Sequence, residues 1–167
     1  MYLVSACLAG FNTRYDGANS LDERVRRLVI SGRAIAVCPE QLGGLPTPRP
    51  PLEFLAGAGA DLLDGTTGVR EAGKKQKNPQ ADGQKCGQKG REEKKINYAE
   101  ALIRGARETL RIARLYGIEE AILKDGSPSC GASYVHSLRR RRKGKGVTAE
   151  LLSREGLKVR GVDSLQG

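Results

Sequence analysis

The sequence contains one histidine, His136, among 167 residues. Catalytic triads and Cys-His pairs use a histidine to accept a proton, and many zinc sites need two histidines, so these classes have little to draw on. No apolar run approaches the roughly 20 residues that span a bilayer. The N-terminus has neither a basic start nor a small-residue cleavage site. We therefore expect a cytoplasmic protein without a membrane partner.

Aromatic residues are also scarce, at 4% of the chain, and tryptophan is absent. Proteins that bind single-stranded nucleic acids stack bases on aromatic side chains, and this chain offers few such platforms. The net charge is nevertheless +10. It is concentrated in residues 73–95, with eight Lys or Arg against three Asp or Glu, and in residues 139–145, with six Lys or Arg.

The two basic segments lead to different expectations. Residues 73–95 are low in apolar content, which predicts a flexible basic insert. Residues 139–145 are predicted to form a basic loop, and either a solvated surface or an RNA contact explains their charge. Binding of tRNA through these segments is therefore one hypothesis for a partner.

Short apolar strands alternate with amphipathic helices, and the length favours one domain over residues 1–167. We predict strands at 2–6, 34–37, 121–123 and 157–162. We predict helices at 21–31 with Ser20 as cap and Glu23 in a capping box, at 97–116 with Asn97 as cap, and at 148–154. A strand, a helix and a second strand within so few residues imply a parallel crossover. The prediction is an α/β, Rossmann-like domain with a mainly parallel sheet flanked by helices.

Three cysteines stand where predicted strands end. Cys7 and Cys38 directly follow strands, and Cys130 follows a third strand after a Gly-Ser-Pro turn. Carboxyl ends of parallel strands share one edge of a sheet, so the three sulfurs are expected to converge there. An intracellular chain of this size uses cysteines for metal binding or catalysis more often than for disulfides.

Three interpretations of these cysteines remain open at this point. Free cysteines are often buried simply as small core residues. Structural zinc wants four ligands, yet the spacing has no CxxC pair. An iron-sulfur cluster held by three thiolates fits the pattern better, because one iron is left to bind a substrate or a small anion. The fourth cysteine, Cys86, lies in the basic insert, where we expect an incidental exposed thiol rather than a reactive one.

Several motifs make the chain resemble the TudS-like family, which includes 4Fe-4S-dependent thiouracil desulfidases. They are VSACL (4–8), RYDG (14–17), VCPE (37–40), GGLPTPRPP (43–51), ILK (122–124), SPSCG (127–131) and GVTAELL (146–152). The resemblance spans nearly the whole chain apart from the basic segments. It departs after SPSCG, where relatives usually continue into a Tyr-Asp-Gly segment and this chain runs from Tyr134 into the arginines.

The resemblance implies that Cys7, Cys38 and Cys130 hold a 4Fe-4S cluster. It implies an enzyme that replaces the thiocarbonyl sulfur of thiouracil, or of a similar thiolated pyrimidine, by the oxygen of water and releases hydrosulfide without redox chemistry. Glu40 and Ser127 correspond to the family's acid-base residues. The reaction needs proton transfers that such groups supply, although a loop carboxylate and a turn hydroxyl would look the same in sequence.

Four further residues are assigned to the substrate pocket: Ser5, Arg14, Asp16 and Ser129. For Arg14 and Asp16, a surface turn and a salt bridge that shapes the pocket are comparable interpretations. Two other functions remain as alternatives. The protein is either a desulfidase for a thiolated base within tRNA or a non-catalytic iron-sulfur protein that binds nucleic acid or acts as a sensor.

Overall fold

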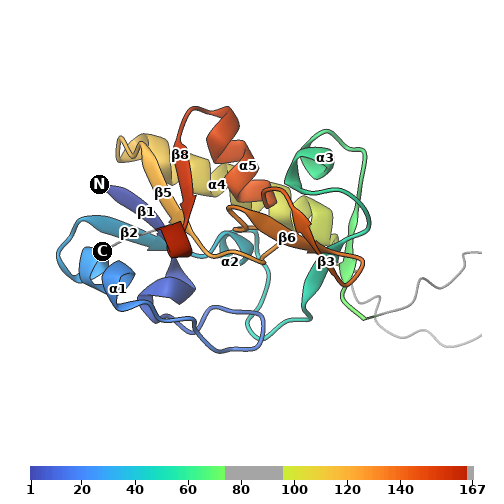
Figure 1. Ribbon diagram of the computed structural model, residues 1–167, viewed down its shortest axis with the longest axis horizontal. Helices are drawn as coiled ribbons and strands as arrows, with labels where there is room; N and C mark the ends of the chain where they lie inside the picture. The colour runs from blue at the N-terminus through green and yellow to red at the C-terminus, as the bar shows by residue number, and fades with distance from the viewer. Residues whose placement is uncertain (74–95, 165–167) are drawn as a thin grey trace, which may run out of the picture.

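A computed structural model describes residues 1–73 and 96–164. Apart from Gly73, the insert predicted at 73–95, with its cysteine Cys86, lies outside the described residues. The described chain forms two four-stranded sheets, which lie toward opposite ends of the long axis of the molecule (Figure 1). The predicted α/β fold with a mainly parallel sheet flanked by helices is confirmed. No helix of the described residues has the length and apolar character needed to cross a membrane.

The first sheet is entirely parallel, with the order β2-β1-β5-β8. Its strands are β1 (Tyr2–Ser5), β2 (Ala34–Val37), β5 (Glu120–Leu123) and β8 (Lys158–Gly161). All four were predicted from their apolar runs to within one or two residues at most ends. In the register of this sheet, Ser5 is opposite Val37, so β1 and β2 end at the same level.

Three helices flank the sheets: α1 (Glu23–Ile30), α4 (Tyr98–Leu115) and α5 (Val147–Arg154). The Asn97 side chain accepts from the Glu100 amide at 3.2 Å, which confirms the predicted cap of α4. The prediction of Ser20 as the cap of α1 is wrong, because the side chain of Asp22 accepts from the first amides of that helix. The Ser20 hydroxyl instead accepts from Arg14 at 2.7 Å.

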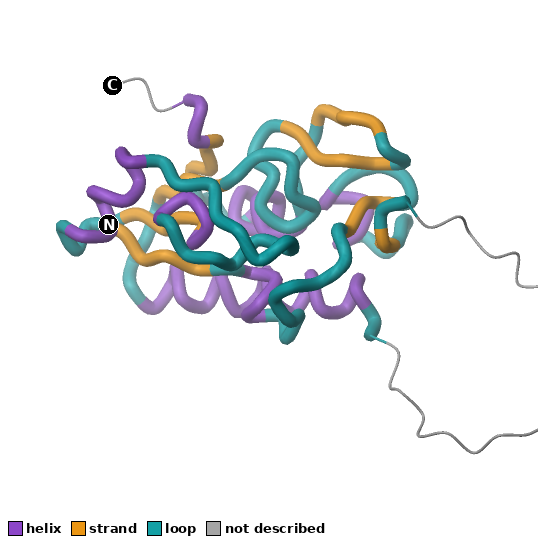
Figure 2. The backbone as a smooth tube through the Cα atoms, turned by 90° about the horizontal axis from the view of Figure 1, so that it is seen from below, coloured by secondary structure: helices purple, strands orange, loops and turns teal. Residues whose placement is uncertain are grey.

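Helix α4 joins the two halves of the molecule, running along its length beneath both sheets (Figure 2). Its C-terminal half, with Leu110 and Ala113, packs in the core of the parallel sheet. Its N-terminal half, with Leu102 and Ala106, packs against Phe54 and other apolar residues of the second sheet. The apolar stripe of one long helix therefore fixes the position of one sheet relative to the other.

The second sheet is mixed, with the order β4-β3-β6-β7, and it was not predicted from the sequence. Its strands are β3 (Leu52–Phe54), β4 (Val69–Glu71), β6 (Tyr134–Ser137) and β7 (Arg140–Lys143), and α3 (Gly59–Leu63) lies between β3 and β4. Each strand has only three or four residues, too few for a clear alternating pattern. Pairing across the sheet, rather than local propensity, forms these strands.

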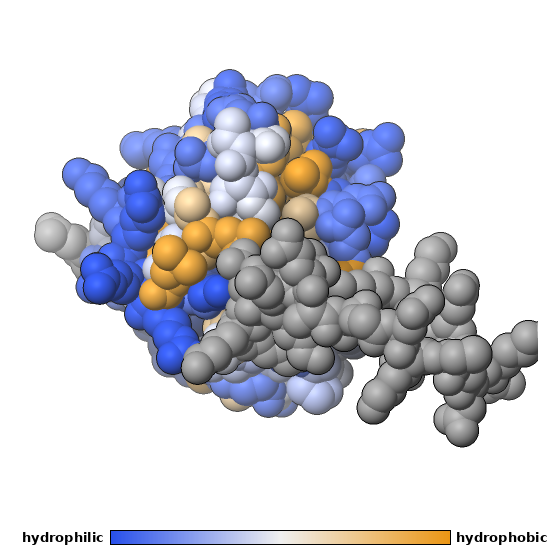
Figure 3. All heavy atoms as spheres, turned by 90° about the vertical axis from the view of Figure 1, so that its right-hand side faces the viewer, coloured by the Kyte–Doolittle hydropathy of each residue, from blue (hydrophilic) through white to orange (hydrophobic). Residues whose placement is uncertain are grey.

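The prediction of a basic loop at 139–145 is wrong for residues 140–143, which form β7 and pair antiparallel with β6. Leu138 and Arg139 make the hairpin turn with φ values of 50° and 63°. Turns of this kind usually carry Gly or Asn, and neither residue type marks this turn in the sequence. A charged edge strand is tolerated because it faces solvent. At this end of the molecule, hydrophilic side chains surround a smaller hydrophobic area (Figure 3).

Three short helices complete the described fold: η1 (Ala6–Ala9), α2 (Pro39–Leu42) and η2 (Val162–Ser164). Helix α2 packs tightly against α4, and glycines make the close approach possible. A Cβ atom on Gly105 of α4 would lie 1.9 Å from the carbonyl oxygen of Pro39, and one on Gly43 would lie 2.1 Å from the carbonyl oxygen of Ala101. Because α2 directly follows Cys38, this contact also holds one of the three cysteines.

We predict that Gly105→Ala destabilises the protein by about 1–3 kcal/mol, because the added methyl group meets backbone that cannot move aside. Helix propensity alone predicts the opposite sign, a gain of up to about 1 kcal/mol. Chemical denaturation measures the free energy of unfolding of both proteins, with Arg107→Ala on the exposed face of α4 as control. A more stable Gly105→Ala variant would show that the contact between α2 and α4 is looser than described.

Candidate functional site

The three cysteines come together where β1, β2 and β5 end. Cys7 lies in η1 directly after β1, Cys38 directly precedes α2 after β2, and Cys130 lies in the turn between β5 and β6. All three line one cavity of about 390 Å³. Cys130 is buried, whereas Cys7 and Cys38 are half-buried and therefore reachable from the cavity. The three are free thiols.

The electrostatics show that these sulfurs act on one another. Burial raises the pKa of the Cys7 thiol to about 11; Lys124 opposes this shift, and Cys38 adds to it. Burial also raises the pKa of Cys130 well above its ordinary value, and the neighbouring Cys7 and Cys38 raise it further. The free thiols therefore stay protonated at neutral pH, and a bound cationic group would remove their protons.

The donor set fits a cluster better than a single ion. Within the described ranges, no three His, Cys, Asp or Glu side chains are grouped closely enough to hold one metal ion. Thiolates that bind different irons of one cluster are spaced more widely than the ligands of one ion. Three cysteines around one cavity, with no fourth cysteine among the described residues, suit a 4Fe-4S cluster that has one iron without a protein ligand.

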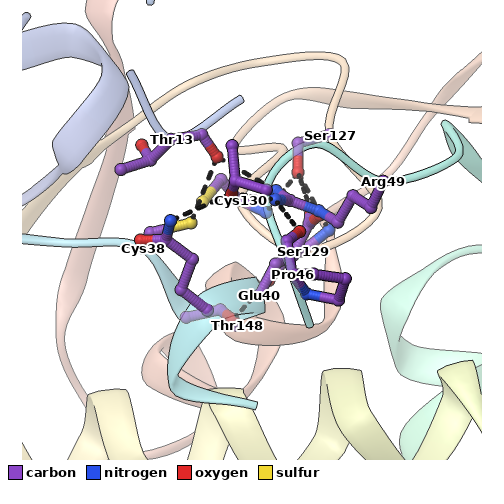
Figure 4. Close-up of polar contacts among 11 residues, drawn as sticks. Thr13, Cys38, Glu40, Pro46, Arg49, Ser127, Ser129, Cys130 and Thr148 are labelled. Atoms are coloured by element: carbon purple, nitrogen blue, oxygen red, sulfur yellow. Dashed lines mark hydrogen bonds and ion pairs between the residues drawn. The ribbon is translucent and has the colours of Figure 1, made fainter. Parts of the chain in front are cut away.

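Glu40 lies in the first turn of α2, two residues after Cys38, and lines the same cavity. Its Oε2 atom accepts from Arg49 Nε at 2.6 Å, and both side chains are almost completely buried. The guanidinium of Arg49 also donates to the carbonyl oxygens of Pro46 and Thr13, and the latter oxygen accepts from the Cys38 thiol at 3.7 Å. These contacts join the carboxylate, the arginine and a cysteine in one network (Figure 4).

Ser127 links this network to the third cysteine. Its hydroxyl donates to Glu40 Oε1 at 3.2 Å and accepts from the amides of Ser129 and Cys130, each at 3.1 Å. The two amides occupy the lone pairs of the hydroxyl oxygen, so its proton is directed toward the carboxylate. The two oxygens of Glu40 thus have separate partners, Arg49 on one side and Ser127 on the other.

The remaining predicted pocket residues have different positions. Ser5 and Arg14 line the cavity, and Ser5 Oγ accepts from the Lys124 amide at 3.0 Å. Asp16 does not line it; this exposed carboxylate pairs with Arg14 at 2.8 Å, and the hydrogen bond lowers the pKa of Asp16. Asp16 therefore orients Arg14, in line with the salt-bridge interpretation.

The assignment of Ser129 to the substrate pocket disagrees with its position. Ser129 is fully buried and does not line the cavity. Its hydroxyl is 3.0 Å from that of Thr148 in α5, so it fastens the cysteine-bearing turn to a helix. The serine next to a candidate ligand was taken as a pocket residue because the sequence does not show which way its side chain points.

Several lining residues were not found from the sequence. Arg49 is part of the GGLPTPRPP motif but received no role, although it is a cation only nine residues after Glu40. The wall opposite the cysteines comes from the second sheet, which supplies Glu53, Tyr134, His136 and Arg139. No sequence signal brought these residues to the site, because the sheet itself was not predicted.

Comparisons with known proteins agree with this geometry. Residues 2–163 match the family described as 2-thiouracil desulfurase. The chain is 36% identical over 162 residues to an uncharacterised protein of Bacillus subtilis (strain 168), YbbK, and this match covers 95% of the chain and 93% of that protein. Among solved structures, it is similar to a 4Fe-4S-dependent thiouracil desulfidase, TudS. That similarity has a TM-score of 0.73 and 34% identity, and it covers 98% of this chain and 91% of the other.

We predict that the anaerobically prepared protein contains about four irons and four sulfides per chain, as one cluster of this type requires. Replacing Cys7, Cys38 or Cys130 by Ala should remove the visible absorption and most of the iron, because each sulfur is one of three attachment points. Cys86→Ser is the matched control and should keep both. Iron loss in the control, or a colourless zinc-containing wild type, would contradict the three-cysteine assignment.

Proposed function

The chain belongs to the 2-thiouracil desulfurase family, and from that membership we propose that it exchanges the thiocarbonyl sulfur of thiouracil, or of a similar thiolated pyrimidine, for oxygen. Cys7, Cys38 and Cys130 would hold a 4Fe-4S cluster for this reaction. The solved relative, described as a 4Fe-4S-dependent thiouracil desulfidase, supports both the reaction and the cofactor.

One observation of the structure carries the proposal. Three cysteines from separate segments and the hydrogen-bonded pair of Glu40 and Ser127 line a single cavity. Buried cysteines that merely fill a core would not be expected to share a cavity with a proton-transfer pair. This arrangement provides the two components that the reaction needs, a place for a sulfur-binding cofactor and a route for a proton.

The cluster, when bound, would supply a Lewis acid for the substrate sulfur at its iron without a protein ligand. Glu40, held by Arg49, accepts the proton of the attacking water through the Ser127 hydroxyl. The water oxygen forms a bond to the ring carbon, and the carbon-sulfur bond breaks with its electron pair on sulfur. Hydrosulfide and one proton are the other products, so no oxidant or reductant is consumed.

Anaerobic turnover of free 2-thiouracil tests the proposal. The expected result is loss of the thiocarbonyl absorption with one uracil and one sulfide formed per substrate, and only by iron-loaded protein. An iron-loaded protein that forms no uracil would contradict the proposal and favour a non-catalytic binding or sensor role.

We predict that Glu40→Gln and Ser127→Ala keep the cluster but slow desulfuration by roughly a hundredfold or more, the usual scale for losing a positioned proton-transfer group. Glu108→Gln, a neutralised carboxylate on the partly exposed face of α4, is the control and should keep the wild-type rate. Iron content and initial rate are measured on the same samples. Full activity in both site variants would remove the pair from the mechanism.

A second candidate substrate is a thiolated base within tRNA, favoured by the basic hairpin, which we define as residues 134–143. All four residues of β7 are exposed cations. The hairpin also contributes cavity-lining Tyr134, whose ring lies 3.7 Å below the Arg141 guanidinium carbon. A cationic surface beside an aromatic residue and the cavity mouth suits a phosphate backbone that carries the reactive base.

We predict that, if tRNA is a substrate, Arg140→Gln combined with Arg142→Gln lowers the magnitude of the log-log salt dependence of tRNA binding by about 0.7–0.9 for each phosphate that the variant no longer neutralises. Neither residue lines the cavity, so activity on free thiouracil should barely change. Filter binding over a range of salt concentrations measures the slope. Weak binding at low salt, or equal slopes, would leave the free base as the substrate.

A further inference from the structure

Lys124 is the first residue after β5 and lines the cavity that the three cysteines share. Its amide donates to Ser5 Oγ at 3.0 Å, which fixes the end of β5 to the last residue of β1. Cys7 lies two residues beyond Ser5. The backbone from which the lysine extends is therefore held close to the turn that carries Cys7.

The other strongly basic side chains around the cavity are already engaged. Arg49 is paired with Glu40, and Arg14 is paired with Asp16. Arg139 donates through its guanidinium to the carbonyl oxygen of Gly73. The Lys124 ammonium differs: it lies 3.4 Å from the carbonyl oxygen of Asp125 and makes no ion pair with any carboxylate of the described residues.

The field of this ammonium acts on the sulfur side of the cavity. Among charged groups, Lys124 has the largest influence on the Cys7 thiol and favours its thiolate, whereas Arg14 contributes less. A half-buried cation beside sulfur, without a carboxylate partner, is arranged to balance negative charge that appears during a reaction. In the proposed reaction that charge is on the sulfur that leaves the ring.

We propose that Lys124 is the anion-holding residue of the site, binding the departing hydrosulfide through its ammonium group. This inference rests on the proposed desulfuration for its chemistry. As the carbon-sulfur bond breaks, its electron pair stays on sulfur, and the positive charge stabilises the resulting anion in the cavity. The proton released from water goes to Glu40, so the ammonium takes part as a charge and donor without being consumed.

Hydrosulfide binding to the iron-loaded protein tests this role without turnover. Sulfide is titrated anaerobically, and the change in cluster absorption gives its affinity. Lys124→Met should bind sulfide roughly tenfold more weakly, since an opposite charge within reach changes the stability of a charged form by at least one power of ten. Lys124→Arg should retain most of the affinity, because it restores the charge.

Lys158→Met is the matched control, since Lys158 lies at the opposite end of the same sheet, where it pairs with Glu120 at 3.5 Å. It should bind sulfide as the wild type does. Equal affinity in Lys124→Met with full iron content would overturn the proposal. Loss of iron in that variant would also overturn it, because the ammonium would then hold the cluster and not the sulfur.

The titration separates this proposal from the proposed function. A wild type without iron would contradict the function before any sulfide is added. Lysine-dependent sulfide binding by a protein that leaves thiouracil unchanged would support the anion site and refute the substrate.

Discussion

β1 lies between β2 and β5, and all three strands run in the same direction. Every other feature of the site depends on this pairing, because parallel strands end at a common edge of the sheet. Residues far apart in sequence, such as Cys7 and Cys130, are thereby carried to one cavity. Short structures then fix each sulfur in place: η1 for Cys7, α2 for Cys38 and a buried turn for Cys130. An antiparallel arrangement of the same strands would separate the cysteines to opposite ends.

The second sheet turns this edge into an enclosed site. Its strands β3 and β6 supply the wall opposite the cysteines, and α4 sets the distance between the walls by packing into both cores. The site thus has a sulfur side, with Lys124 and the cysteines, and a side with Tyr134 and Arg139 that meets the basic hairpin. We infer that the first side carries the reaction chemistry and that the second determines which thiolated compound enters.

The sequence revealed the parallel sheet because β1, β2 and β5 are compact apolar runs, and it revealed α4 because its stripe extends over an 18-residue helix. The cysteines were found as candidates for the same reason, since each follows such a run. Short strands such as β3 have no comparable signal, so the wall that they build was not predicted. Side-chain direction was equally inaccessible. Ser127 and Ser129 flank the same proline, yet one faces Glu40 and the other is buried against Thr148. Only tertiary packing decides between those two directions.

The central claim is that water supplies the oxygen that replaces sulfur at this cavity. The most direct test is a single anaerobic turnover of 2-thiouracil by the iron-loaded protein in water enriched in oxygen-18, without an electron donor. The account predicts uracil that carries one oxygen-18 atom at the former thiocarbonyl carbon, with one hydrosulfide released. Uracil without the label, or a reaction that proceeds only with an added oxidant or reductant, would contradict it.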